Sequence, residues 1–321
     1  ASHGGGTEEG QREVLAGYGI TEERLGVPVV TTVDTVYLGN CANGRPVWFD
    51  RAAYEADLIV PINRVKLHTD FVGPIQSGLC KMLVIGLGNH KGCSAVHEEA
   101  PEVFADAIEE TARLILQKAP VGFGIAILEN AYDKTYAVEA VPAEHLVERE
   151  KELVQIAKGN MPYIMLDEAD VIVCGAIGKD ISGAGFDPNI LGRSSVLKQF
   201  VLHIPRYQRL VLCDVTPASH GNGIGVGLFD VITKKVAEQL DLESMYANAI
   251  ACNCLGDASV PCTVDDEETA IRVALKCCRN IDRDHPRIIR IQNTLHLGEI
   301  EVSEALLDAV RADSRMSLIE N

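Results

Sequence analysis

The chain of 321 residues lacks the features that define several protein classes. No apolar run approaches the roughly 20 residues that a membrane-spanning helix requires, so no membrane partner is expected. The first residues do not show the charged-then-apolar pattern of a secretory signal, and we expect a cytoplasmic protein. Internal repeats and low-complexity segments are absent as well. A hydrophobic content of 47% is instead typical of a compact globular protein.

Positive charge is also scarce. The sequence has 29 Lys and Arg against 46 Asp and Glu, a formal net charge of −17, and its cations form no cluster. Because phosphate binding needs a positive face, nucleic acid is not an expected partner. No Gly-x-Gly-x-x-Gly motif opens a helix with an acidic residue about 20 positions later, which disfavours an ordinary NAD-dependent oxidoreductase.

Cysteines are abundant, but they are not spaced like the ligands of a structural metal. With no secretion signal, the ten cysteines are expected to be reduced and to pack as small hydrophobic side chains. One group invites a metal interpretation, but its Cys-x-Cys start lacks the Cys-x₂-Cys spacing of zinc sites. We interpret this group as buried thiols in preference to a zinc or iron–sulfur site: Cys252, Cys254, Cys262, Cys277 and Cys278.

The length permits two domains, and strand-like runs alternate with helical patterns along the whole chain. This alternation predicts the α/β class, with mostly parallel sheets flanked by helices and an active site in the cleft between the domains. We place the domains at residues 1–160 and 161–321. Residues 1–15 read as though a strand had just ended and a helix began at Thr7, so we expect the first domain to lack its first βα units.

The pattern of apolar residues predicts individual elements. One or two strands, split by a turn at Asn43 and Gly44, are expected within residues 26–49. Strands are expected where short apolar runs are flanked by turn residues, and helices where apolar residues recur at helical spacing. The expected strands lie at 58–62, 82–87, 121–130, 170–174, 209–213 and 287–294. The expected helices lie at 50–55, 101–118, 142–160, 267–278 and from 303 onward, with residues 194–204 as a crossover.

The segment 57–97 is the predicted active site. His68 and Lys81 fall in a glycine-flanked loop between two predicted strands, and His97 follows the second strand. Ligands of open α/β sheets bind beyond the carboxyl ends of the strands, where loops carry the functional groups. A lone histidine or lysine at such a place is more often a surface residue. The ordered combination favours function, whereas His90 in the same segment is a weaker candidate.

These residues resemble the nickel-dependent lactate racemase superfamily, which racemises or epimerises 2-hydroxy acids. The start ASHGGGTEEGQ resembles the family's Gly-Thr-His-Arg loop and Thr-Glu-Glu helix start, and matches its histidine at His3. The run ADLIVPINRVKLH matches a strand that ends in a histidine, at His68. Lys81 resembles the lysine that carries the cofactor. His97 lies 97 − 81 = 16 positions later, the place of the nickel-ligating histidine.

The resemblance implies a specific chemistry. The cofactor would be a nickel pincer, pyridinium-3-thioamide-5-thiocarboxylate mononucleotide, bonded covalently to Lys81, with His97 as a nickel ligand. The pyridinium ring would accept a hydride from the α-carbon of a small 2-hydroxy acid. Such a hydrogen is too weakly acidic for a side chain to remove readily, so hydride transfer is the sensible route. His3 and His68 would be the catalytic acid–base pair, one for each enantiomer.

The second half departs from the family. At the positions where lactate enzymes hold the substrate carboxylate with Gln and Lys, this sequence has Gly192 and Ser195, so the substrate is not expected to be lactate. Arginine is well suited to clamp a carboxylate. The predicted substrate-binding residues are Lys179, Arg193, His220 and Asn222. The family's Asp-Asp-x-Thr-Arg loop is missing. A catalytically silent or divergent binding protein of the same fold therefore stays the alternative, and the sequence does not specify the oligomeric state.

Overall fold

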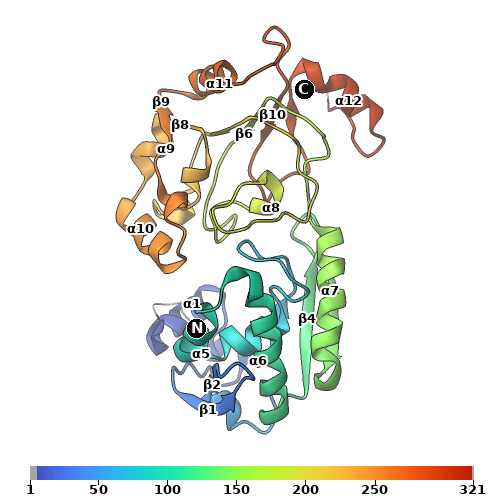
Figure 1. The fold of residues 1–321 in the computed structure, drawn as a ribbon. Helices are drawn as coiled ribbons and strands as arrows, with labels where there is room; N and C mark the ends of the chain where they lie inside the picture. Colours follow the sequence, from blue (N-terminus) through green and yellow to red (C-terminus); the bar gives the residue numbers. More distant parts are fainter. Residues whose placement is uncertain (1–5, 320–321) are drawn as a thin grey trace. The chain divides into compact units, whose positions relative to one another are not determined.

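A computed structural model describes residues 6–319 (Figure 1). The chain divides into two compact units. Unit 1 extends from the N-terminus to Asn130 and continues from Lys134 to Asn160, and unit 2 contains 131–133 and 161–321. Both units combine sheets with helices, which confirms the predicted α/β class. Within residues 6–319, no helix is both long and apolar enough to cross a bilayer.

The larger sheet of unit 1 has the strand order β3-β4-β5, with β3 (Ile62–Arg64) parallel and β5 (Thr135–Pro142) antiparallel to β4 (Phe123–Glu129). Alternate residues of β4 are buried, as expected for a strand with one covered face. A Cβ on Gly124 would lie 2.7 Å from Leu79 and 3.3 Å from Leu146. Helices α4 (Leu79–Lys81) and α7 (Leu146–Asn160) therefore cover this face of the sheet.

The remaining elements of unit 1 largely follow the sequence pattern. Strands β1 (Thr35–Asn40) and β2 (Pro46–Asp50) lie on either side of the predicted turn and pair as a hairpin. Thr7 caps the first helix as expected, since its Oγ1 accepts the Gly10 N–H at 3.1 Å. The helices outside the site are α1 (Glu8–Gly17), α2 (Glu22–Leu25), α3 (Arg51–Tyr54) and α6 (Phe104–Lys118), the last preceded by a 3₁₀ turn at Pro101–Val103.

The strand predicted at 82–87 is wrong. Helix α4 leads directly into a π-helix, η2 (Met82–Gly86), and then into α5 (Asn89–His97). A short apolar run does not by itself distinguish a strand from a buried helical segment. Here Leu79 and Leu83, four residues apart, are both fully buried, as on one face of a helix. The strand predicted at 58–62 is displaced as well. Ile59 forms only an isolated bridge with Val121, and β3 begins at Ile62.

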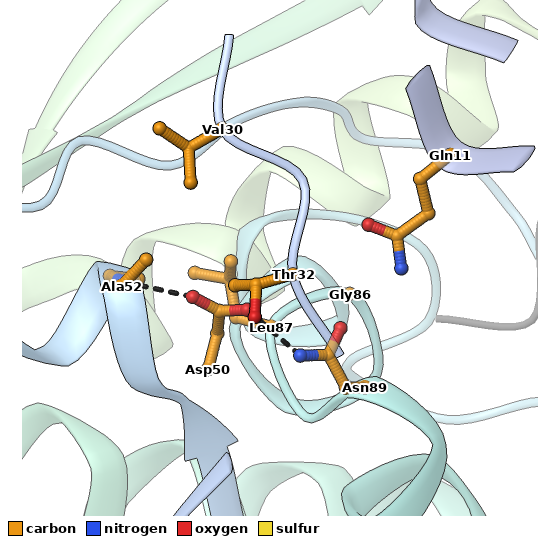
Figure 2. A pocket seen from close by; sticks show the side chains of 9 residues that line it. Gln11, Val30, Thr32, Asp50, Ala52, Gly86, Leu87 and Asn89 are labelled. Carbon is orange, nitrogen blue, oxygen red and sulfur yellow. Dashed lines mark hydrogen bonds between the residues drawn. The ribbon is translucent and has the colours of Figure 1, made fainter. Parts of the chain in front are cut away.

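The chain turns a corner between η2 and α5, and buried polar groups fix that corner. Asn89 is buried in the left-handed region, with φ of 49°. Its Nδ2 donates to Asp50 Oδ2 at 2.8 Å, and the Asp50 N–H donates to the Leu87 carbonyl at 2.6 Å. A Cβ on Gly88 would lie 2.1 Å from the Val84 carbonyl, so the turn requires glycine there. Figure 2 shows the Asp50–Asn89 contact at an open cavity of about 360 Å³.

Unit 2 is built on a sheet with the order β11-β10-β6-β7-β8-β9. Strands β6 (Val171–Cys174), β7 (Arg209–Leu212), β8 (Val231–Thr233), β9 (Cys262–Val264) and β10 (Ile288–Ile291) are parallel, and β11 (Glu301–Val302) is antiparallel. The helices are α8 (Pro188–Leu191), α9 (Lys234–Gln239), α10 (Leu242–Ala251), α11 (Glu267–Lys276) and α12 (Leu307–Ala312). Residues 194–204 cross between β6 and β7 without helix or strand.

The cysteine group of unit 2 is only partly buried. Cys254 and Cys278 are buried as predicted, but Cys252, Cys262 and Cys277 are exposed, so their interpretation as buried thiols is wrong. Each of these three lies at or beyond the end of a helix or strand, where an apolar residue is not forced inward. Among residues 6–319, no three His, Cys, Asp or Glu side chains form a group that could hold a metal ion.

We predict that Asn89→Ala lowers the free energy of unfolding of unit 1 by about 2–5 kcal/mol. About 1–2 kcal/mol comes from the left-handed backbone and about 1–3 kcal/mol from the lost partner of buried Asp50. The single tryptophan, Trp48 on β2, reports on this unit in urea titrations followed by fluorescence. Asn89→Gly is the control, because glycine adopts the left-handed backbone without strain and so isolates the loss of the Asp50 contact. An unchanged stability of Asn89→Gly would contradict the proposed role of that contact.

Candidate active site

Lys81 ends α4, and its Nζ lies 2.6 Å from His68 Nε2. The two residues belong to segments that pair locally. The backbone N–H of Lys66 donates to the Ser77 carbonyl at 2.9 Å, and Ser77 donates back at 3.2 Å. The His68 N–H then donates to the buried side chain of Gln76 at 2.7 Å. These hydrogen bonds restrain the backbone at His68 and at Ser77, four residues before Lys81.

The hydrogen bonds also define which atoms carry protons. The backbone N–H of Asp70 donates to His68 Nδ1 at 3.1 Å, so the proton of a neutral imidazole resides on Nε2. Burial, followed by the charge of Lys81, holds the pKa of His68 well below its usual range, which favours that neutral form. Nε2–H then faces Lys81, whose Nζ accepts only as a neutral amine.

Burial agrees with this assignment at the lysine. Desolvation is the largest influence on Lys81 and lowers its pKa to about 8, against an ordinary value of 10.5. The neutral amine is therefore accessible near physiological pH. A desolvated neutral lysine is a nucleophile, the state in which lysines form covalent bonds to substrates and cofactors. This separates Lys81 from a solvated surface lysine.

His97 ends α5 and has an imidazole oriented by its own helix. Its Nδ1–H donates to the Cys93 carbonyl at 2.7 Å, and Cys93 Sγ lies 3.4 Å from the same nitrogen. The hydrogen bond with Cys93 raises the pKa of His97. A backbone carbonyl on Nδ1 leaves the lone pair of Nε2 outward, which is how metal-ligating histidines are commonly held.

A chain of aromatic rings connects the two histidines. The ring centroids of His68 and Phe71 are 4.3 Å apart, those of Phe71 and Phe104 4.9 Å, and those of Phe104 and His97 5.0 Å. Both phenylalanines are buried. They form an apolar wall beside the polar groups of His68, Lys81 and His97, and such a wall lowers the local dielectric.

A buried carboxyl group lies at the start of α4, the helix that ends in Lys81, and the sequence did not predict it. Glu150 of α7 is fully buried, and its Oε2 accepts the Cys80 N–H at 2.8 Å at the start of α4. Desolvation raises the pKa of Glu150 to about 7. One signal was available in the sequence: Glu150 shares the apolar helical face of Leu146, Val154 and Ala157.

The other predicted residues are distributed as follows. His3 lies outside the described residues. His90 is exposed on α5. In unit 2, Lys179 Nζ and Asn222 Nδ2 both donate to Asn248 Oδ1, a residue that the sequence did not mark. His220 is exposed, with φ of 47°.

Arg193 makes a separate set of contacts. Its guanidinium pairs with Asp230 at 2.7 Å, donates to the Leu228 carbonyl at 2.9 Å and lies over the Tyr207 ring at 5.3 Å. The structure therefore joins Lys179 with Asn222 and places the charge of Arg193 against a carboxylate of its own unit. The location of the active site in a cleft between the domains stays a prediction.

No family model and no curated protein matches the chain. Among solved structures, it is similar to the lactate racemase apoprotein from Thermoanaerobacterium thermosaccharolyticum, with 14% sequence identity and a TM-score of 0.45 over 80% of this chain and 73% of that chain. It is also similar to a structural-genomics target from Thermotoga maritima, with 14% identity and a TM-score of 0.40 over 64% of this chain and 55% of that one. This distant likeness concerns the fold alone.

We predict that Glu150 makes unit 1 less stable as the pH rises. Its folded pKa of about 7 lies above the ordinary 4.5, so its stabilising contribution is complete below pH 4.5 and is lost as the pH rises through 7. The loss is about 3 kcal/mol at 1.36 kcal/mol per pH unit. Glu150→Gln should remove this slope in urea titrations followed by Trp48 fluorescence at several pH values.

The control for this slope is Glu152→Gln, an exposed glutamate on the same helix. It should retain the wild-type pH dependence, because a solvated carboxylate gains little from folding. Parallel pH profiles for wild type and Glu150→Gln would show that the buried carboxyl does not titrate in this range.

Proposed function

We propose that the chain is a nickel-pincer-dependent racemase or epimerase of a 2-hydroxy acid other than lactate. The observation that carries the proposal is the contact between the Lys81 amine and His68 Nε2, with His97 at the other end of the Phe71–Phe104 wall. These are the positions that match the tether, acid–base and metal-ligand residues of the racemase superfamily.

The residues present fit the cofactor. Covalent attachment needs a nucleophilic amine, and burial brings the pKa of Lys81 to about 8. Nickel accepts imidazole together with soft sulfur ligands, and His97 can offer Nε2 because Nδ1 is held by Cys93. Lys81 would hold the organic part and His97 the metal. When bound, the group supplies a hydride acceptor for the hydrogen on the substrate's α-carbon.

His68 would handle the proton of the substrate hydroxyl. The tautomer with Nδ1 accepting from the Asp70 N–H carries its proton on Nε2 and cannot take a second proton there. As a base, the neutral ring would therefore carry its proton on Nδ1 and accept the hydroxyl proton on Nε2. The Asp70 carboxylate lies 3.9 Å from Nδ1, a separation at which its charge favours a proton on that nitrogen. The imidazolium so formed would be the acid that returns the Nε2 proton to the substrate oxygen.

The substrate carboxylate would be bound by Lys179. Its ammonium is grouped with two amide side chains, Asn222 and Asn248, that can add hydrogen bonds to a carboxylate or to a second polar substituent. Arg193 is the other cation proposed for this role, although Asp230 already balances its charge. A polar group on the substrate beyond the 2-hydroxy acid is consistent with this amide-rich set.

We predict distinct losses for the tether and the metal ligand. Lys81→Met should abolish the covalent mass increase of cofactor-loaded protein, because it removes the attacking nitrogen. His97→Ala should retain the mass increase but lower the nickel content, because it removes one ligand and not the tether. Intact-mass spectrometry and elemental analysis measure the two quantities. Lys91→Met and His90→Ala, both exposed on α5, are the matched controls. An undiminished mass increase on Lys81→Met would overturn the proposed tether.

We predict that His68→Asn keeps cofactor and nickel but interconverts enantiomers about 10²–10⁴-fold more slowly, the usual cost of losing a positioned acid–base group. The same result is expected for His3→Ala. Chiral chromatography of the 2-hydroxy acid measures the rate.

The mechanism has its own test in the wild-type enzyme. Deuterium placed on the α-carbon of the substrate should remain in the product of the opposite configuration, since hydride transfer keeps that hydrogen from solvent. Complete exchange of the label into water during turnover would exclude hydride transfer and indicate simple proton abstraction.

A further inference from the structure

We infer that Glu150 is a positioning residue for Lys81: from α7, its buried carboxylate holds the first turn of α4 and so keeps the lysine amine against His68. The inference rests on the proposed function insofar as Lys81 is the reactive group there. Glu150 has no match in the motifs that point to the active site, and it is 70 residues from the backbone group that it binds.

The start of α4 lacks a local cap. Its N-cap residue is Gly78, which has no side chain to accept the free N–H groups of the first turn. Glu150 supplies the acceptor: Oε2 accepts the Cys80 N–H at 2.8 Å, and the Leu79 N–H also stabilises the carboxylate. From the other side, Asn63 Nδ2 of β3 donates to the Gly78 carbonyl at 2.9 Å. Two distant elements therefore hold the three residues that precede Lys81.

The glycine at position 78 is explained by the same contact. Its φ of 178° is extended backbone that any residue can adopt. However, a Cβ there would lie 2.6 Å from both the carboxyl carbon and Oε1 of Glu150. Any side chain at position 78 would displace the carboxylate from the helix start. Gly78 and Glu150 therefore act together as one cap: because Gly78 has no side chain, the carboxylate of Glu150 can reach the start of α4.

This cap formed by Gly78 and Glu150 carries a free-energy penalty that a purely structural cap would not need. Glu150 is fully buried, and its Oε1 has no hydrogen-bond partner among the residues that the structure describes. An under-satisfied buried carboxyl group destabilises a fold, and a serine or aspartate at position 78 would cap a helix without this penalty. What the carboxylate of Glu150 adds is a fixed orientation of the first turn of α4. Because α4 has three residues, holding the Cys80 N–H fixes the backbone at Lys81, the next residue.

The experiment measures Lys81 itself, in the full chain without cofactor. An acetyl N-hydroxysuccinimide ester labels amines in proportion to their neutral fraction, and peptide mass spectrometry quantifies Lys81 across pH 6–11. The wild-type midpoint is expected at about 8. In Glu150→Ala, which removes the acceptor, and in Gly78→Ala, the loosened first turn should allow the amine to leave His68 and become solvated. The midpoint should rise by about one pH unit, about tenfold less neutral amine at pH 7.

Three comparisons make the result decisive. Exposed Lys91 in the same samples is the internal reference, and Glu152→Ala is the matched control on α7, with no expected change. Gly78→Ala leaves Glu150 unchanged, so a shared effect identifies their contact. Trp48 fluorescence verifies that each variant is folded, and where Glu150→Ala is not, Gly78→Ala decides.

Lower stability with an unchanged Lys81 midpoint in both variants would overturn the inference and leave Glu150 as a structural cap alone. The labelling requires neither nickel nor turnover. A wild-type chain that never acquires cofactor would refute the proposed function while leaving this test of Glu150 intact.

Discussion

The contact between Lys81 and His68 is the constraint on which the rest of unit 1 depends. Two basic groups 2.6 Å apart in a desolvated site cannot both be positively charged, because the like charges would repel at low dielectric. The contact is therefore stable only if other groups determine which nitrogen donates. The Asp70 N–H does so at the imidazole, and burial does so at the amine. The surrounding structure thereby favours the neutral, nucleophilic amine of Lys81.

The backbone around this contact is restrained at points far apart in sequence. Glu150 and Asn63 hold the start of α4, and the Asp50–Asn89 hydrogen bond holds the corner before α5. Glu150, Asp50 and Asn89 are buried and Asn63 is partly buried, and buried polar groups stabilise a structure only when their partners are in place. These hydrogen bonds restrain the direction of one helical run more specifically than hydrophobic contacts would.

The sequence was informative wherever a pattern was long or chemically explicit. The amphipathic helix α6, the turn at Asn43–Gly44 and the wholly buried strand β6 follow from periodicity and turn chemistry. The pattern failed at 82–87, since five apolar residues and a glycine fit a strand or a buried helix equally well. It also missed β5, an edge strand whose residues are mostly exposed.

In the candidate site, too, some residues could be predicted from an explicit sequence pattern and others could not. His68, Lys81 and His97 could be selected because their order and spacing match a family motif. Glu150 and Asn248 could not be selected in this way, because their partners are backbone or side-chain groups brought near only by tertiary structure. A glutamate in a charged helix reads as a solvated residue until its neighbours on the apolar face are considered.

The π-helix and the turn after it determine how the 16 residues between Lys81 and His97 place these two side chains. On one straight α-helix, that spacing would separate the two residues by about 24 Å along the axis and direct them about 160° apart around it. The i→i+5 turn of η2 and the left-handed Asn89 break this geometry. The spacing is therefore a property of a bent path, and one residue inserted into η2 would rotate His97 by about 100° relative to Lys81. In relatives of this chain, length changes between the lysine and the histidine are expected to be rarer than substitutions there.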